Sequence, residues 1–252
     1  MNNGQFLRFK KARERFKNTV EELSRSLPNL QNIQQEFIDS RSNLKNSSYI
    51  VETPVVYNTA LDNITVNDEI KIILVADNPG RREQAAENRR YLIGPSGKIA
   101  QKFFHNNSEL GIDFTKNVII LNKTPIHSPR TIELRQLVSL EEKTGSSSIS
   151  SALEKSQKVM ASLLIEFHEA LDVQIWITGY SEMKKGGLFE AYTNELKTLY
   201  AKKPELFKQL FIYRHFSMNQ FTIDLKQQSL PKENLKQSLK KIGEAYKHRI
   251  LG

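Results

Sequence analysis

Four short apolar segments divide the chain from residue 70 onward, and helical patterns lie between them. Each segment is apolar on successive residues and rich in β-branched or aromatic side chains, as is typical of strands buried on both faces of a parallel sheet. The segments are IKIILVA (70–76), NVIILN (117–122), VQIWIT (173–178) and QLFIYR (209–214), with helical spacing over 97–106, 149–170 and 187–202. This alternation predicts an α/β three-layer sandwich, in which a central four-stranded parallel sheet with right-handed crossovers is flanked by helices.

The first sixty residues show a helical pattern without strand segments. Apolar side chains at helical spacing predict an amphipathic helix over 5–26 that Pro28 ends; they are Phe6, Phe9, Phe16, Val20 and Leu23. A second helix is predicted over 30–46, before an irregular stretch. We therefore predict a helical N-terminal extension over 1–60 and an α/β domain over 61–252.

Two further elements are predicted towards the C-terminus. Residues 139–151, which include TGSSSISS, indicate a loop whose serines cap the next helix. A last helix is predicted from near Pro231 to about Arg249, because Pro is tolerated in the first turn of a helix.

The composition narrows the class of protein. A chain of 252 residues with 38% hydrophobic content is long enough to bury a substantial core. The absence of cysteine excludes disulfides, thiolate catalysis, cysteine-ligated zinc fingers and cysteine-held iron-sulfur clusters. No apolar stretch reaches the 18 residues of a membrane span, and the N-terminus lacks the apolar core of a secretory signal. We expect a soluble, cytoplasmic monomer.

The charge favours a polyanionic partner. Lys and Arg number 37 against 28 Asp and Glu, which gives a formal net charge of +9. Six basic side chains fall within residues 1–18, namely Arg8, Lys10, Lys11, Arg13, Arg15 and Lys17, and the segment from Lys226 to Arg249 is also Lys-rich. Each phosphate that such a surface neutralises releases condensed counterions. Solvated helix faces are an equal alternative on charge alone.

Polar residues follow the predicted strands. Asp77-Asn78-Pro79-Gly80 follows the first strand, Asn122 ends the second, Gly179-Tyr180-Ser181 follows the third, and a segment beginning at His215 follows the fourth. In open parallel sheets, ligands bind beyond the carboxyl ends of the strands. The pattern therefore predicts a site at this edge of the sheet.

Taken singly, these residues favour structural roles. Asn-Pro-Gly is typical of a turn, Asn122 of a satisfied strand end and His215 of a buried histidine. GPSGK (94–98) lacks the spacer of a phosphate loop, and no G-x-G-x-x-G occurs, so no dinucleotide cofactor is predicted. The five histidines (105, 127, 168, 215 and 248) are far apart, so no metal is predicted either.

Taken in order, four segments resemble the motifs of the uracil-DNA glycosylase superfamily: ADNPG, YLIGPSGKIAQKFF, IILNKTP and RHFSMNQ. The first is similar to the Gly-x-Asn-Pro-Gly loop of the mismatch-specific and single-strand-selective branches, with Ala76 in place of the leading Gly. The second is similar to the Pro-Phe-Val-Gly-x-x-Gly segment of the iron-sulfur branch, whose cluster this cysteine-free chain lacks. Gly94 and Gly97 match that segment, while Tyr91 and Leu92 replace its Pro and base-stacking Phe.

The other two segments match the uracil-reading Asn and the His-Pro-Ser-Pro loop of the same superfamily. Asn122 matches the Asn, and His215 and Ser217 match the loop, in which Phe216 and Met218 replace both prolines. The resemblance covers about residues 70–225.

The resemblance implies a role for each matched residue. Asn78 would orient the attacking water, more slowly than an Asp because it accepts no proton, and His215 would donate to uracil O2. Asn122 would pair with uracil O4 and N3–H, which excludes cytosine. The implied base-binding residues are Asp77, Tyr91, Leu92 and Asn122, with Tyr91 as the stacking ring if the loop shifts by one position. The implied DNA contacts are Ser217 at a phosphate, Phe216 or Met218 as a wedge in the base stack, and Arg81 and Arg82.

The sequence thus predicts a hydrolase that removes uracil or a related deaminated base from DNA, without a cofactor, in base excision repair. The alternative is a catalytically silent nucleic-acid-binding module on the same fold. A third possibility is a protein that binds or hydrolyses a free nucleoside or nucleotide. For the predicted hydrolase, the partner is uracil-containing or damaged DNA.

Overall fold

A computed structural model describes residues 1–42, 49–143, 148–230 and 233–252. Its strands are β1 (Ile72–Ala76), β2 (Val118–Asn122), β3 (Gln174–Thr178) and β4 (Leu210–Tyr213). All pair in parallel, in the order β2-β1-β3-β4. The predicted α/β class with a central parallel sheet is confirmed, and the four predicted strands are the four observed ones.

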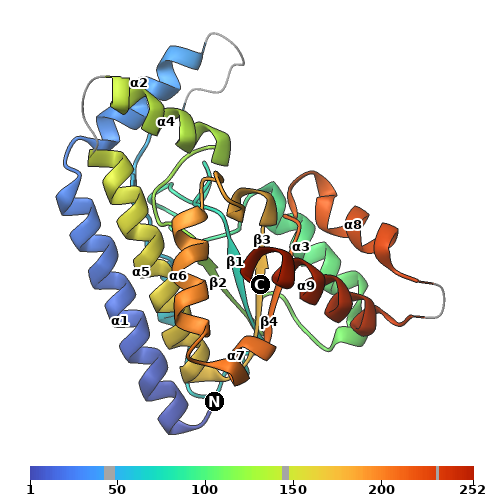
Figure 1. Ribbon diagram of the computed structural model, residues 1–252. Coiled ribbons are helices and arrows are strands. Elements are labelled where there is room, and N and C mark those ends of the chain that lie inside the picture. Colours follow the sequence, from blue (N-terminus) through green and yellow to red (C-terminus); the bar gives the residue numbers. More distant parts are fainter. Residues whose placement is uncertain (43–48, 144–147, 231–232) are drawn as a thin grey trace.

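Helices cover both faces of this sheet (Figure 1). One face carries α5 (Ser148–Leu171) and α6 (Glu190–Tyr200), and the other carries α3 (Pro95–Asn106), α8 (Gln220–Gln228) and α9 (Leu235–Leu251). The remaining elements are α1 (Asn3–Ser26), α2 (Leu30–Ser42), α4 (Thr131–Lys143) and α7 (Pro204–Lys208), with 3-10 turns η1 (Thr59–Asn63), η2 (Ser108–Leu110), η3 (Tyr180–Met183) and η4 (Ser217–Asn219).

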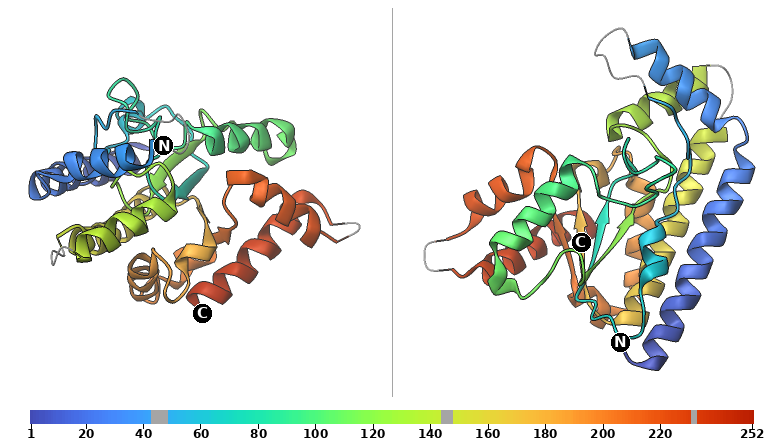
Figure 2. Two further views of the ribbon diagram at one scale, coloured as in Figure 1. Left: turned by 90° about the horizontal axis from the view of Figure 1, so that it is seen from above. Right: turned by 180° about the vertical axis from the view of Figure 1, so that it is seen from behind.

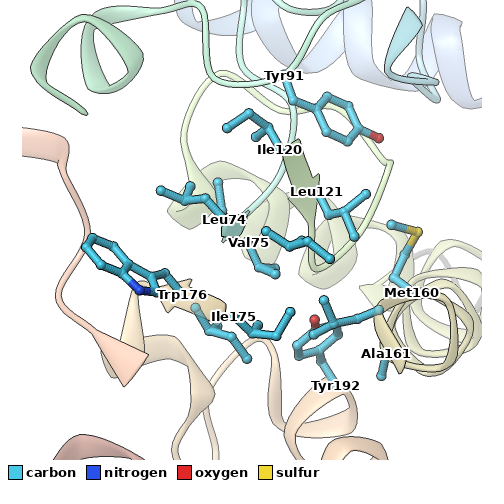
Figure 3. Packing of buried hydrophobic residues seen from close by; sticks show 14 of the residues in the cluster. Leu74, Val75, Tyr91, Ile120, Leu121, Met160, Ala161, Ile175, Trp176 and Tyr192 are labelled. Carbon is cyan, nitrogen blue, oxygen red and sulfur yellow. The ribbon is translucent and has the colours of Figure 1, made fainter. Parts of the chain in front are cut away.

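The strand side chains form two apolar layers, one on each face of the sheet. Leu74 pairs with Ile120 and Trp176 on the face that carries α3. Val75 and Leu121 lie on the opposite face, where Met160 and Ala161 of α5 and Tyr192 of α6 meet the sheet (Figure 3). Because both faces are covered, the strands are apolar on successive residues, which is the pattern that predicted them.

The N-terminal helix α1 packs along α5 (Figures 1 and 2). Phe9 and Phe16 are fully buried; the ring of Phe9 lies 5.6 Å from that of Phe167, and Phe16 lies 5.2 Å from Tyr57. These side chains belong to the same hydrophobic core as the sheet. Residues 1–60 therefore complete the packing of the α/β domain, and truncating either Phe to Ala is expected to cost about 3–5 kcal/mol.

Several predicted boundaries differ from the observed ones. The helices α4, α7 and α8 were not predicted, and α4 extends to Lys143 within the predicted loop over 139–151. The last helix begins at Leu235 because Asn234 forms a capping box with Gln237. The predicted start at Pro231 and the serine cap within 144–147 lie outside the described residues, as does the predicted continuation of the second helix over 43–46.

Candidate functional site

The carboxyl ends of β1 and β3 lie side by side in the sheet. The chain passes from β1 outward to β2 and then back across β1 to β3, which makes this a topological switch point. Asp77 follows β1 here, and Gly179 follows β3. A Cβ at Gly179, whose φ is +83°, would lie 2.4 Å from Asp77 Oδ1. Glycine is therefore required for the Asp77 carboxylate to lie this close to the end of β3.

Lys123, the residue after β2, contacts the ends of both β1 and β3. Its Nζ donates to Asp77 Oδ1 at 2.5 Å and to the Thr178 carbonyl oxygen at 2.6 Å. The side chain is fully buried, and Nζ lies 4.9 Å from the centre of the Phe189 ring. Burial lowers the pKa of Lys123, and the carboxylate of Asp77 acts in the opposite direction. One side chain thus joins the carboxyl ends of three strands.

The sequence prediction missed Lys123. The signal was present, since a lysine stood directly after an apolar strand and the uracil-reading match at Asn122. A lysine at the end of a buried strand is usually solvated, because charged side chains are almost never fully buried unless they are paired. Here the partner is Asp77, forty-six positions earlier in the chain, so only the fold reveals the pair.

Asn78 is hydrogen bonded through both ends of its amide. Its Nδ2 donates to Ser128 O at 3.1 Å, to Ser128 Oγ at 3.0 Å and to Pro79 O at 3.2 Å. Its Oδ1 accepts from the Thr131 hydroxyl at 3.3 Å, and the same hydroxyl lies 3.2 Å from Asp77 Oδ2. An amide oxygen has two lone pairs, so Oδ1 retains one acceptor position for water.

A second hydrogen-bond network, centred on His127, holds the Asn78 loop. His127 is buried, with Nδ1 2.8 Å from Pro79 O and Nε2 2.8 Å from the Tyr49 hydroxyl. A carbonyl only accepts, so Nδ1 carries the proton and Nε2 accepts from Tyr49. Burial lowers the pKa of His127 to about 4. Gln34 of α2 donates to His127 O at 2.8 Å, which ties the N-terminal helices to the loop.

Glu83 also stabilises this loop by a hydrogen bond. Its carboxylate accepts from the Gly80 N–H at 3.0 Å and lies beside the backbone of residues 92–94. Burial raises the pKa of Glu83 to about 7, against the opposing effect of these backbone N–H groups. The Asn78 loop and the segment that leads into α3 are therefore joined by one buried carboxyl group.

His215 lies near the Asp77 and Lys123 pair. The Ser217 N–H donates to His215 Nδ1 at 3.0 Å, so the neutral ring carries its proton on Nε2. Burial lowers the pKa of His215 most, Asp77 raises it and Lys123 lowers it further. At neutral pH the ring is therefore uncharged and presents Nε2–H as a donor, and no group among the described residues accepts from it.

The side-chain amide of Asn122 is buried and, within the part of the chain that the structure describes, unpaired. The residue is 1% exposed, and among the described residues neither Nδ2 nor Oδ1 has a hydrogen-bond partner. Its position two residues after Ile120 places it on the face of the sheet that carries α3, and η4, which follows His215, packs against α3. An unpaired buried donor or acceptor costs about 1–3 kcal/mol. Such a cost is accounted for if a ligand supplies the missing hydrogen bonds.

The structure places Tyr91 in the core. The ring is 3% exposed, lies 6.3 Å from Phe16, and its hydroxyl donates to Val56 O at 2.5 Å. Its neighbour Leu92 is buried with φ of +55°, and its carbonyl oxygen lies where a Cβ on Gly97 would be, at 1.6 Å. The matched Gly97 thus permits the close approach of this loop, whereas Tyr91 is packed as a core residue and does not present a stacking face.

The predicted DNA contacts separate into buried and exposed side chains. Phe216 is fully buried and stacks on Phe221 at 4.3 Å, so its predicted role as a wedge is not available to it. Met218 is 83% exposed, with φ of +52°, and Ser217 is half-buried. Both arginines are exposed, and the guanidinium of Arg81 lies 4.8 Å from the centre of the Tyr49 ring.

Comparison with known proteins leaves the family open. No protein-family model, no curated protein and no solved structure matches this chain. In the described part of the chain, no group of three or more His, Asp or Glu side chains is arranged to hold a metal ion. Among the same residues, no helix has the length and apolarity that crossing a bilayer requires.

Proposed function

We propose that the chain is a DNA glycosylase-like hydrolase that removes uracil or a related deaminated base from DNA. The observation that carries this proposal is the buried, unpaired amide of Asn122 at the carboxyl edge of the sheet. It offers a donor and an acceptor side by side, as does the edge of a nucleobase. The charged pair of Asp77 and Lys123 and the neutral His215 lie at the same edge.

Asn122 supplies the selectivity. Its Oδ1 accepts from uracil N3–H and its Nδ2 donates to O4, so both unpaired atoms gain partners when the base enters. Cytosine has an amino donor at C4 and a bare ring nitrogen at N3, so it pairs only with the flipped amide, in which the two atoms exchange places. The amide therefore favours uracil over cytosine when it is held in the first orientation.

His215 stabilises the departing base. Breaking the bond between C1′ and N1 leaves an electron pair on the base, and negative charge spreads to O2. The Nε2–H group of the neutral His215 ring is oriented by the Ser217 N–H on Nδ1. A fixed donor of this kind acts where charge develops in the transition state and needs no reorganisation.

Asp77 and Asn78 act on the sugar side. Positive charge builds on C1′ as the base leaves, and the carboxylate of Asp77 supplies a negative charge that Lys123 keeps in place. The remaining acceptor position on Asn78 Oδ1 orients the attacking water. The proton released from this water passes to the Asp77 carboxylate or to solvent, because an amide cannot take it.

A cleavage assay tests the proposal. Single- and double-stranded oligonucleotides that contain uracil, hypoxanthine or xanthine are incubated with the protein, and abasic sites are cut with alkali and resolved on a gel. We expect uracil excision that falls about 100-fold or more in His215→Leu and Asn78→Ala. If no substrate is cut above the level of these variants, the proposal is wrong.

A catalytically silent nucleic-acid-binding module is the second candidate. It is favoured by Asn78, whose Nδ2 donates to Ser128 and Pro79 and whose Oδ1 accepts from Thr131, as a purely structural residue requires. It predicts salt-dependent DNA binding without cleavage. In that case Asn78→Ala leaves the affinity for DNA unchanged.

A further inference from the structure

A groove runs along the outer side of the edge strand β2. It consists of two adjoining hollows of about 540 and 710 Å³. The two hollows share the side chains of Lys98, Gln101, Phe114 and Thr115. The first hollow also touches Arg82 and Leu92 of the segment that joins β1 to α3, so the groove begins on the segment that carries Asn78.

Five exposed cations border this groove. Arg82, Arg90, Lys98 and Lys116 line the first hollow, and Lys98 and Lys102 line the second. Within the described residues none of the five has a carboxylate oxygen within 4.0 Å. Arg13, Arg15 and Lys71, by contrast, each form an ion pair. The cations of the groove are therefore available to an anion.

The two acidic residues of the groove form hydrogen bonds within their own turns and no ion pair with these cations, although Asp113 still interacts electrostatically with Lys116. Asp68 Oδ2 accepts from the N–H and the hydroxyl of Thr65, at 2.7 and 2.9 Å. Asp113 Oδ1 accepts from the N–H and the hydroxyl of Thr115, at 2.8 and 2.7 Å. Both carboxylates cap their own turns, and the groove keeps an excess of positive charge.

The lining between the cations is apolar and includes an aromatic ring. Leu61, Ile64 and Ile70 line the first hollow, and Phe114 lines both. Phe114 is half-buried and stacks on the fully buried Phe104, with ring centres 5.7 Å apart. A supported aromatic ring beside unpaired cations is the arrangement that binds single strands, since bases stack on the ring and phosphates meet the cations.

We propose that this groove binds a single-stranded stretch of nucleic acid, with Phe114 as the stacking platform and the five cations along the sugar-phosphate backbone. The bases of a duplex are already stacked on one another and cannot reach Phe114 without melting. The groove lies along the side of the sheet, whereas the Asp77 and Lys123 pair lies at its carboxyl edge.

Binding of uracil-free oligonucleotides of about 15 nucleotides tests the proposal. Fluorescence anisotropy is measured with single-stranded DNA, single-stranded RNA and duplex DNA over a range of salt concentrations. The groove variant is Arg90→Gln/Lys98→Gln/Lys102→Gln/Lys116→Gln. We expect it to lower the slope of log affinity against log salt by about 3, since each phosphate contact on a single strand contributes about 0.7. The unsubstituted protein should bind either single strand more tightly than the duplex.

The matched control removes the same charge from another surface. Arg8→Gln/Lys10→Gln/Lys11→Gln/Lys17→Gln changes four exposed residues on the outer face of α1. An equal loss of slope in this control would show that net charge alone attracts the strand, and would overturn the proposal. Tighter binding of the duplex than of either single strand would also overturn it.

Phe114→Leu tests the stacking platform separately. This variant keeps an apolar side chain against Phe104 and is expected to lower single-strand affinity by about tenfold, with an unchanged salt slope. Unchanged affinity would remove Phe114 from the site. Because all probes lack uracil, none of these results depends on whether the protein excises a base.

Discussion

Two asparagines lie at the ends of neighbouring strands of the same sheet, and their side chains differ in hydrogen bonding. Asn78, just after β1, forms hydrogen bonds through both its amide nitrogen and its amide oxygen. Asn122, the last residue of β2, is more deeply buried and forms none among the described residues. The fold explains the first, since its bonds hold a loop. It does not explain the second, because an unpaired buried amide destabilises the folded chain.

The difference indicates a structural role for Asn78 and a ligand-binding role for Asn122. A side chain whose hydrogen bonds are complete contributes to stability whether or not the protein does anything. A buried side chain without hydrogen-bond partners lowers the free energy of unfolding until a ligand supplies those partners. Binding sites commonly lose stability in this way for the sake of activity. Our predictions test this contrast, starting with Lys123, which follows Asn122 in the chain and pairs with Asp77.

Lys123→Met is expected to have the largest effect. The substitution keeps the length of the side chain but leaves the Asp77 carboxylate, 13% exposed, without its partner. Breaking a buried pair in this way costs about 3–5 kcal/mol of the free energy of unfolding, which urea denaturation measures. The double variant Asp77→Asn/Lys123→Met should recover most of the loss. If the double variant is as unstable as the single one, the cost is due to packing, and the pair does not join the strands electrostatically.

Glu83→Gln is expected to change how stability depends on pH. The folded-state pKa of Glu83 is about 7, above the ordinary value of 4.5, so the folded protein binds the proton more tightly than the unfolded chain. Stability therefore falls as pH rises from about 4.5 to 7, by up to about 3 kcal/mol for this group. The Gln variant should match the parent protein near pH 4.5 and be more stable near pH 8.

Urea denaturation at both pH values measures this effect. Glu87→Gln, at an exposed position in the same loop, is the control and should leave the pH dependence as it is. A parent protein that is more stable near pH 8 than the Gln variant would show that Glu83 holds the loop as a carboxylate and that its burial is not costly.

The two asparagines themselves should respond with opposite signs. Asn78→Ala removes the bonds to Ser128 and Thr131 and is expected to lower the free energy of unfolding by about 1–3 kcal/mol. Asn122→Leu replaces an unpaired amide with an apolar side chain of similar size and is expected to raise it by about 1–2 kcal/mol, while uracil excision is lost. Thermal and urea denaturation give both values. Destabilisation by Asn122→Leu would mean that the amide is satisfied in the folded protein and that no ligand is needed to explain it.

The fold was largely predictable because its signals are local. Strands buried on both faces must be apolar throughout, and β1 to β4 all carry that pattern. The start of the last helix was misplaced because Pro231 and Asn234 are both good N-terminal residues, and the capping box between Asn234 and Gln237 decided between them. Helix α4 was not predicted, although TIELRQLV (131–138) carries its apolar residues at helical spacing.

Only those features of the candidate site that depend on the local sequence could be predicted. Residues placed after strands did gather at one edge, as for Asp77 and His215. Contacts between distant segments had no signal in the sequence: neither the pairing of Lys123 with Asp77 nor the packing of Phe216 on Phe221 follows from local pattern. Phe216 is an aromatic residue in a polar loop, and such a residue can be a wedge or part of the core. The position of α8, which carries Phe221, decides between the two.

The packing of α1 on α5 has a consequence for how the chain folds as it is synthesised. Phe9 is made more than 150 positions before its partner Phe167. Until α5 has left the ribosome, the apolar stripe of α1 has no surface to cover it and is exposed to other chains. Contacts this far apart in sequence are slow to form, because a long loop must close before they are gained. During synthesis α1 is therefore exposed to chaperones until α5 is made.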